Sequence, residues 1–361
     1  MKILVINPGS TSTKIALFDN ETLIFEHKLD HAADQNFQQQ FGKIGNVFNQ
    51  YPYRFEQILK ILTDKNVTQL DAVVGRGGML PPNTSGTYQI NQKMFDDLRD
   101  RPQANHASNL GAPIALEIAK KFNIPDKAFI VDPVTTDEIE PKHKITGFPE
   151  IKRAPGWHAL NQKAVCREYA KSINKRYEDL NLICAHLGGG FSFGAHKKGK
   201  TINVINATSG EGPITPERSG QIPAQGLIDL CFSGKYSKEE VSYKILGGGG
   251  LFALLGTKDM IELENKYSTL NPEQKDVVDE MIAGISRNIC CLIPDFEGEK
   301  VDQIILTGGV VRWPLVVEKV KQDLYTVNVG ITVYHGEKEL EALRDGAIRV
   351  LTGQEDAKIY N

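Results

Sequence analysis

The chain begins with Met-Lys-Ile-Leu-Val-Ile-Asn-Pro-Gly-Ser-Thr-Ser-Thr-Lys-Ile-Ala-Leu-Phe-Asp, residues 1–19, and this stretch decides the fold. Its first apolar run, Ile3 to Ile6, predicts a buried strand, and a second run, Ile15 to Phe18, predicts its partner. Between them lies a turn of small and hydroxyl-bearing residues that ends at Lys14. Backbone N–H groups, hydroxyls and a lysine in one turn can bind a phosphate, although an ordinary glycine-containing hairpin fits the same pattern.

Related units recur further along the chain. Asn181 to Ala185 is another buried-strand run, and it leads into His186-Leu-Gly-Gly-Gly190 and a second strand pattern over residues 191–196. The two strand–turn–strand units lie about 180 residues apart, half the chain, which indicates a duplicated domain. A third strand run, Ile304-Ile-Leu-Thr-Gly-Gly309, ends in paired glycines before a predicted helix. Three such strand ends suit a nucleotide-binding protein.

These motifs resemble those of the acetate and butyrate kinases, a family within the actin-like phosphotransferase superfamily. Residues 7–14 look like the first phosphate motif of that family, residues 186–190 like the second, and Thr307-Gly-Gly309 like the adenosine motif. The resemblance continues in family order through Val74-Gly-Arg-Gly-Gly78, His106-Ala-Ser-Asn-Leu-Gly111, Ile130-Val-Asp-Pro133, Trp157-His-Ala-Leu-Asn161, Glu211-Gly-Pro213, Pro216-Glu-Arg-Ser-Gly220 and Tyr334-His-Gly-Glu337. The opening and the Gly-Arg-Gly-Gly block are more similar to butyrate or branched-chain fatty acid kinases than to acetate kinases.

The alternation of strand and helix patterns predicts an α/β fold. The resemblance implies two ribonuclease H-like (actin-like ATPase) domains in a duplicated arrangement with an interdomain cleft. We expect the first domain to comprise residues 1–150 plus about 340–361, with the first phosphate motif and part of the acyl site. Residues 151–339 would form the second domain, with the second phosphate motif and the adenosine motif.

The resemblance implies an ATP-dependent short-chain fatty acid kinase, which converts butanoate and ATP into butanoyl phosphate and ADP by direct in-line transfer, with Mg²⁺ as cofactor. Isobutyrate or another branched acid is an alternative acceptor. Two further hypotheses stay open: an acetate or propionate kinase, and a non-catalytic actin-like nucleotide-binding protein. The family also implies a homodimer or larger homo-oligomer.

The resemblance assigns roles to individual residues. The catalytic set is Arg76, Asp132, His158 and Arg218. The nucleotide- and phosphate-binding set is Asn7, Ser10, Ser12, Lys14, His186, Gly188, Gly189, Gly190, Gly308 and Gly309. The acyl pocket would be lined by Gly77, Gly78 and Trp157, and the metal held near Asn7 and Glu337, with Glu339 the alternative to Glu337.

The residue types fit these roles chemically. Arg76 and Arg218 lie in glycine-rich, otherwise apolar settings, where two guanidinium groups could clamp carboxylate and phosphoryl oxygens. Either arginine alone could instead pair with a surface carboxylate. Gly77 and Gly78 stand where acetate kinases carry bulky aliphatic residues, and we expect the missing side chains to leave room for at least four carbons.

Asp132 is predicted to orient the metal or an arginine. A carboxylate acceptor is already ionised at neutral pH, so the reaction needs no general base. The alternative role for Asp132 is to form a turn before Pro133.

Other segments give weaker or misleading signals. A literal P-loop string spans Gly194 to Thr201, but the strand pattern after it predicts a hairpin turn where a P-loop needs a helix. Gly247 to Gly250 fits a flexible loop or a close backbone approach, and we favour the loop. Residues 34–53 are expected to form a surface insertion. Thr257-Lys-Asp259 resembles a family element beside the adenine, but Ile261 stands where that family usually has arginine.

Composition limits the remaining possibilities. The 361 residues are 40% hydrophobic and 24% charged, with a formal net charge of −3 and a pI near 6.3. These values argue against nucleic-acid and membrane partners. The 5 cysteines follow no disulfide or zinc spacing, and no signal-peptide or membrane-span pattern is present. Reduced thiols and a cytoplasmic location are therefore expected.

Overall fold

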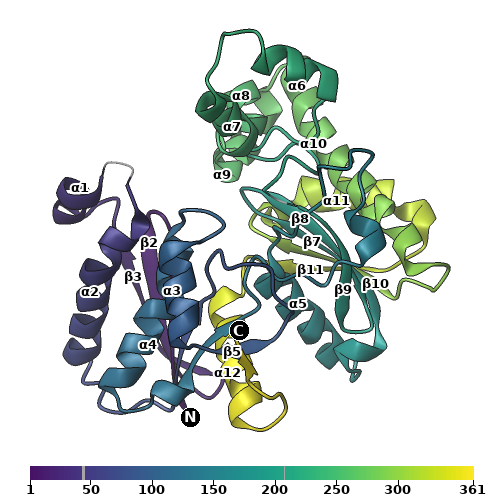
Figure 1. The fold of residues 1–361 in the computed structure, drawn as a ribbon. Helices are drawn as coiled ribbons and strands as arrows, with labels where there is room; N and C mark the ends of the chain where they lie inside the picture. Colours follow the sequence, from purple (N-terminus) through teal and green to yellow (C-terminus); the bar gives the residue numbers. More distant parts are fainter. Residues whose placement is uncertain (43–44, 207) are drawn as a thin grey trace. The chain divides into compact units, whose positions relative to one another are not determined.

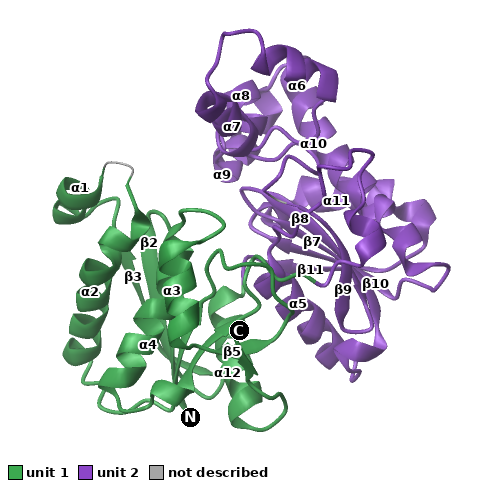
Figure 2. Cartoon of the chain, in the orientation of Figure 1, with its two compact units in different colours: residues 1–137, 338–361 green, residues 138–337 purple. Residues whose placement is uncertain are grey.

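The computed structural model describes residues 1–42, 45–206 and 208–361, which form two compact units (Figures 1 and 2). Unit 1 comprises residues 1–137 and 338–361, and unit 2 comprises residues 138–337. The sequence-based boundaries were 150 and about 340. Residues 138–150 belong with unit 2 because Glu138 pairs with Lys163 at 2.7 Å and the Glu140 N–H donates to the carbonyl of Ile202.

Unit 1 is built on a seven-stranded sheet in the order β12-β5-β6-β4-β1-β2-β3. Its strands are β1 (Lys2–Pro8), β2 (Ser12–Asp19), β3 (Thr22–Asp30), β4 (Ala72–Arg76), β5 (Thr87–Gln89), β6 (Ala128–Val131) and β12 (Lys358–Ile359). β1 and β2 form the predicted hairpin, with Ile6 opposite Ile15. β1, β4 and β6 are parallel neighbours, so their carboxyl ends share one edge of the sheet.

Helices cover both faces of this sheet. Ile130 packs in one core with α4 (Gly111–Lys121), whereas the next residue, Val131, faces Gly346 on α12 (Glu339–Leu351). Because successive strand residues point to opposite faces, α4 and α12 lie on opposite sides of the sheet. The other helices of unit 1 are α1 (Gln35–Phe41), α2 (Tyr51–Asp64) and α3 (Gln92–Asp100).

Unit 2 repeats this plan. Its five strands are β7 (Asn181–Leu187), β8 (Phe191–Lys197), β9 (Lys200–Ile205), β10 (Gln303–Gly308) and β11 (Ile331–His335). Their order, β11-β10-β7-β8-β9, matches β6-β4-β1-β2-β3 of unit 1, again with three parallel strands beside an antiparallel hairpin. The duplication expected from the sequence is therefore present in the sheet topology.

The helices of unit 2 are α5 (Ala159–Ser172), α6 (Ala224–Cys231), α7 (Lys238–Leu246), α8 (Gly250–Leu255), α9 (Met260–Lys266), α10 (Pro272–Cys291) and α11 (Pro314–Asp323). α5 packs on one face of the sheet and α10 with α11 on the other. α5 ends at Ser172, and the chain turns at Asn174, whose φ is +54°. The segment between β9 and α10 contains α6 to α9, which are labelled in Figure 1.

Two minor predictions can be checked directly. The P-loop string is a hairpin turn, as predicted, with Lys198 and Gly199 at φ +48° and +83° between β8 and β9. The flexible-loop interpretation of the glycine run is wrong. A Cβ on Gly250 would lie 2.0 Å from the Thr215 carbonyl oxygen, and one on Gly249 would lie 2.3 Å from that of Lys244. These glycines allow a close backbone approach.

The predicted insertion, residues 34–53, contains α1 and the start of α2, while residues 43 and 44 lie outside the described part. Within the described ranges, no helix combines the length and apolar character needed to cross a membrane.

Candidate phosphate and nucleotide sites

The predicted site residues of unit 1 gather at the carboxyl edge of its sheet. Asn7 lies near the end of β1, Arg76 ends β4, and Asp132 directly follows β6. Ligand sites of α/β sheets commonly lie at this edge.

Asn7 and Arg76 are joined through a glutamate at the start of α12. The amide nitrogen of Asn7 donates to Oε2 of Glu339 at 2.8 Å, and Arg76 forms an ion pair with Oε1 of the same residue. Glu339 is 14% exposed. Of the two glutamates left open by the sequence, Glu339 therefore lies with Asn7 and Arg76, and Glu337 belongs to unit 2. Separated from Asn7 by 332 residues, Glu339 could not be matched to it by local spacing.

Asp132 occupies an unusual backbone conformation. It is 1% exposed with φ +38°, and its Oδ1 accepts hydrogen bonds from the Ser85 hydroxyl at 2.5 Å and the Gly86 N–H at 2.9 Å. A buried non-glycine residue in this region is strained, and such strain is concentrated at functional sites. The carboxylate thus stabilises a turn, which is the alternative role considered for Asp132 in the sequence analysis. It is also held at the sheet edge, directly after β6.

The glycines around Arg76 are explained by close packing. A Cβ on Gly77 would lie 2.7 Å from Pro133 Cβ, and one on Gly78 would lie 2.6 Å from both Cα and Oδ1 of Asn109. Asn109 Oδ1 also accepts from the N–H of Met79 at 2.8 Å. The space beside both glycines is filled, so the idea that they leave room for a longer acyl chain needs correction.

The first turn presents polar groups outward. Ser10 and Lys14 are exposed and Ser12 is half-buried. The turn is closed by the Gly9 N–H, which donates to the Ser12 carbonyl at 2.7 Å. An ammonium and two hydroxyls are therefore at least partly accessible on this hairpin.

In unit 2, two histidines are stacked at the sheet edge. The rings of His158 and His186 are 3.7 Å apart and inclined by 7°. The Ser192 hydroxyl accepts from Gln162 Nε2 and from the His158 backbone N–H, so its single hydrogen points to His158 Nδ1 at 2.8 Å. His158 therefore carries its ring proton on Nε2.

His186 has the same tautomer. Its Nδ1 accepts from Asn161 Nδ2 at 2.9 Å, which leaves the proton on Nε2. Nε2 is buried without a hydrogen-bond partner among the described residues and lies 3.4 Å from Glu337 Oε1. Both rings thus carry their proton on Nε2.

Arg218 is a buried cation placed against the second glycine turn. A Cβ on Gly190 would lie 2.2 Å from Arg218 Cζ, so the guanidinium occupies the space that any other side chain would need. Within the described chain, its Nε and Nη1 are buried with no hydrogen-bond partner. Burial lowers the pKa of Arg218, against the opposing effect of Glu217. A partner-poor buried guanidinium favours binding of an anion.

The loop that carries Arg218 is fixed by the glycine run at α8. The Thr215 hydroxyl donates to the Gly189 carbonyl at 2.8 Å and accepts from the Arg218 N–H. Gly249 N–H donates to the Glu217 carbonyl, and Gly250 packs against the carbonyls of the same loop. The close approach described above therefore positions Arg218.

A pocket of about 340 Å³ lies beside the second and third glycine turns of unit 2. It is lined by Gly188, Gly189, Pro216, Lys258, Met260, Ile261, Glu264, Gly309, Val310, Arg312, Trp313 and Glu337. Gly308, at φ +105°, packs against the Leu187 carbonyl and turns the chain so that Gly309 reaches the wall. Met260, Ile261 and Trp313 give the pocket an apolar side, while Lys258 and Arg312 supply positive charge.

Trp157, predicted to line an acyl pocket, is a core residue. It is 2% exposed, packs with Ile139, Ala159 and Val204, and meets the ring of His196 edge-on at 5.8 Å. Its neighbour His158 is the residue of that motif that reaches the site.

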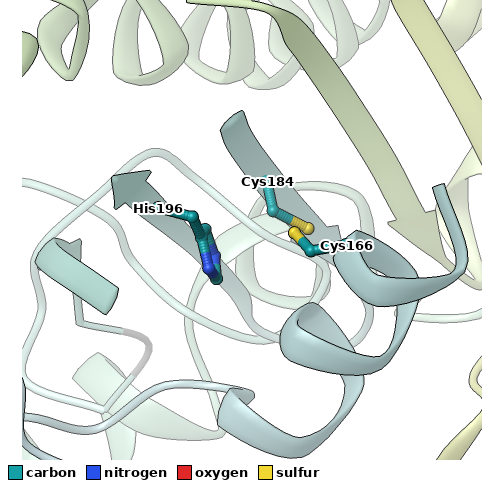
Figure 3. Close-up of side chains that lie close together, drawn as sticks. All are labelled: Cys166, Cys184 and His196. Atoms are coloured by element: carbon teal, nitrogen blue, oxygen red, sulfur yellow. The ribbon is translucent and has the colours of Figure 1, made fainter. Parts of the chain in front are cut away.

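A second cluster of potential ligands lies inside unit 2. Cys166, Cys184 and His196 are fully buried, with ligand atoms within 4.8 Å of one another (Figure 3). Both nitrogens of His196 are engaged, Nδ1 with the Tyr177 hydroxyl at 2.7 Å and Nε2 with Gln162 Oε1 at 3.1 Å. Burial raises the pKa of the Cys184 thiol. The donor set thus fits a structural role, with protonated sulfur and an occupied imidazole.

Comparisons with known proteins agree with this geometry. Residues 146–356 match the model of the acetokinase family. A probable butyrate kinase of Clostridium botulinum is 45% identical over 361 residues, covering 99% of each chain, and butyrate kinase 2 of Clostridium acetobutylicum is 45% identical with the same coverage. This chain belongs to the acetokinase family.

The fold agrees with membership of the acetokinase family. The crystal structure of Porphyromonas gingivalis acetate kinase superposes with a TM-score of 0.77 at 19% identity, covering 97% of this chain and 99% of that one. The two α/β units therefore have the duplicated actin-like fold expected from the sequence.

Sequence reasoning missed part of this acetokinase site. Arg312 and Trp313 line the pocket, but Arg312 ends a 3-10 turn after the adenosine motif and Trp313 follows it, with no distinctive spacing. Ile261 stands where the family usually has arginine, and Arg312 supplies a guanidinium to the same pocket. A search for cations near the third glycine turn could have found it.

Proposed function

We propose that this chain is a short-chain fatty acid kinase that forms butanoyl phosphate and ADP from butanoate and ATP. The observation that supports it most is the guanidinium of Arg218, buried over Gly190 with two nitrogens unpartnered in the described chain. The full-length relatives named butyrate kinase support the acyl acceptor.

ATP would occupy the pocket of unit 2. Met260 and Ile261 suit the apolar base, and the lining glycines, Gly188, Gly189 and Gly309, would let phosphate oxygens approach their backbone N–H groups. Lys258 or Arg312 would neutralise part of the phosphate charge. The pocket volume of about 340 Å³ lies in the range of small-ligand sites.

The transfer step moves one phosphoryl group. A carboxylate oxygen of butanoate attacks the γ-phosphorus of ATP, a new P–O bond forms, and the P–O bond to ADP breaks without net proton transfer. Arg218 and the Nε2–H groups of His158 and His186 would donate to the phosphoryl oxygens. In unit 1, Arg76, Lys14 and the hydroxyls of the first turn offer positive charge and donors that suit a carboxylate or phosphate group.

The residues of unit 1 fit a hard divalent cation. Asn7 Oδ1 and the Glu339 carboxylate offer oxygen ligands, which Mg²⁺ prefers, together with water. We assign the metal to this pair in place of Asn7 with Glu337. When bound, Mg²⁺ would supply positive charge that partly neutralises phosphate oxygens. Asp132 would orient these ligands.

The test is an acyl phosphate trap. Purified protein is incubated with Mg²⁺, ATP, hydroxylamine and butanoate, and hydroxamate and ADP are measured together, with reactions lacking acid or ATP as controls. Equal amounts of hydroxamate and ADP that depend on butanoate are expected. Nucleotide binding with no hydroxamate from any acid between acetate and valerate would favour a non-catalytic nucleotide binder.

A further inference from the structure

Arg54 on α2 is fully buried directly beneath the first turn, and the proposed function gives it no role. Its Nη1 donates to the Gly9 carbonyl and to the Thr13 hydroxyl oxygen, both at 2.9 Å. Nε and Nη2 both donate to Gln50 Oε1, at 3.1 and 2.8 Å. Each guanidinium nitrogen thus donates at least one hydrogen bond, four in all, and the group reaches into the hairpin predicted to bind phosphate.

All acceptors of Arg54 are neutral. In the described part of the chain, no carboxylate lies within ion-pair distance of its guanidinium, and burial is the cause that lowers its pKa, to about 10. Arg54 is therefore still charged at neutral pH. Buried charges are normally paired, and a charge without a counter-ion lowers the stability of the folded protein.

Aromatic residues of the 34–53 insertion, for which the sequence indicated no function, lie around this charge. The Phe37 ring of α1 lies 5.3 Å from Arg54 Cζ and stacks on His31 at 4.5 Å. Tyr53 meets Phe37 edge-on and donates from its hydroxyl to Asp34, the N-cap of α1. Aromatic rings that exclude water reduce the local dielectric screening, so the charge acts more strongly on its surroundings.

We propose that Arg54 is a positioning residue that uses its uncompensated charge to draw a phosphoryl anion to the first turn, and that Phe37 and Tyr53 of the insertion shield that charge from water. The proposal rests on the proposed phosphate role of the turn. Arg54 would not touch the anion. It would act through Gly9 and Thr13, which it holds in place, and through its field.

The decisive variant is Gln50→Glu. It retains the shape of the acceptor and both hydrogen bonds to Arg54, but supplies the missing carboxylate. If the charge of Arg54 serves the anion, Gln50→Glu should raise the KM for ATP about tenfold and reduce the shift in unfolding midpoint produced by inorganic phosphate, although the protein without ligand becomes more stable. A purely structural Arg54 would leave both phosphate readouts unchanged.

Two further variants complete the test. Gln57→Glu makes the same charge change two turns along α2 and should behave as wild type in both phosphate readouts. Arg54→Lys keeps the positive charge but replaces the planar guanidinium by an ammonium. It should retain most of the shift in unfolding midpoint that phosphate produces. Unchanged ATP and phosphate responses in Gln50→Glu, or equal loss in Gln57→Glu, would overturn the proposal. Absence of acyl phosphate in wild type would instead overturn the proposed function, because the phosphate titration does not depend on turnover.

Discussion

The guanidinium of Arg218 lies so close to Gly190 that a Cβ on the glycine would be 2.2 Å from Arg218 Cζ. The two residues are 28 positions apart, yet the glycine of one motif is required by the arginine of another. The third glycine of the His-Leu-Gly-Gly-Gly turn therefore makes room for a protein cation. This relationship gives a direct way to displace the cation without removing it.

Gly190→Ala should lower kcat about 100-fold while changing the unfolding midpoint little, because the atom that must move is the end of a flexible side chain. Steady-state kinetics and thermal unfolding measure the two effects. The control is Gly226→Ala, since a Cβ there meets nothing within 4 Å. A kcat close to that of wild type in Gly190→Ala would show that the position of Arg218 is unimportant.

Arg218→Met should separate stability from activity. Removing a buried guanidinium that lacks partners should raise the free energy of unfolding by about 1 kcal/mol, and kcat should fall by roughly two to four orders of magnitude. ATP affinity measured without acid should change little. Denaturant unfolding, kinetics and calorimetric titration provide the three readouts. A variant that is both less stable and active would mean that Arg218 supports the fold.

His31 should make unit 1 sensitive to acid. Burial and Arg54 lower the pKa of His31 to about 4, while Asp34 and Asp30 oppose the shift. The unfolded chain binds this proton near pH 6.5 but the folded chain does not, so the free energy of unfolding should decrease from pH 6.5 to 4. Protonation would also place a second positive charge close to Arg54, because Arg54 Nη1 donates to the Thr13 hydroxyl that is hydrogen-bonded to His31 Nε2.

His31→Gln should flatten this part of the pH dependence, as measured by urea unfolding at several pH values. His27→Gln, an exposed position on β3 of the same unit, is the matched control and should retain the wild-type slope. Parallel curves for His31→Gln and wild type would refute the assignment.

The acyl preference follows from burial of methylene groups. Butanoate has two more methylenes than acetate, each worth about 0.8 kcal/mol when buried, so kcat/KM for butanoate or isobutyrate should exceed that for acetate by at least about tenfold. A series from acetate to valerate measures this ratio. Equal efficiency with acetate would assign the chain to the acetate or propionate kinases.

Local patterns predicted what is local. The hairpins after Ile6 and Ala185 were recognised because each combines strand, turn and strand within about 20 residues. The P-loop string was recognised as a hairpin turn for the same reason, since a strand pattern follows it closely. Their repetition also predicted the duplicated sheet.

Residues whose roles depend on distant partners were misread or missed. Gly77 and Gly78 suggested space because the sequence does not show that Pro133 and Asn109 fill it. Likewise, nothing near Arg54 in the sequence indicates that it is buried without a carboxylate, since Gly9 and Thr13 are more than 40 positions away. Such contacts between distant residues depend on the chain topology, which short sequence motifs do not reveal.

Asp132→Asn should raise the Mg²⁺ concentration required for activity and lower kcat, while the shape of the pH–rate profile is kept. Asparagine tolerates the φ of +38° at this position, and its carbonyl oxygen can still accept from Ser85 and Gly86, so the change isolates the charge. The acceptor carboxylate has no proton to give, which leaves Asp132 the orientation of metal ligands or arginine. The profiles are compared at saturating Mg²⁺, with thermal unfolding as a check that the turn is intact. Selective loss of an acidic limb in the variant would reveal a proton-transfer role and contradict this assignment.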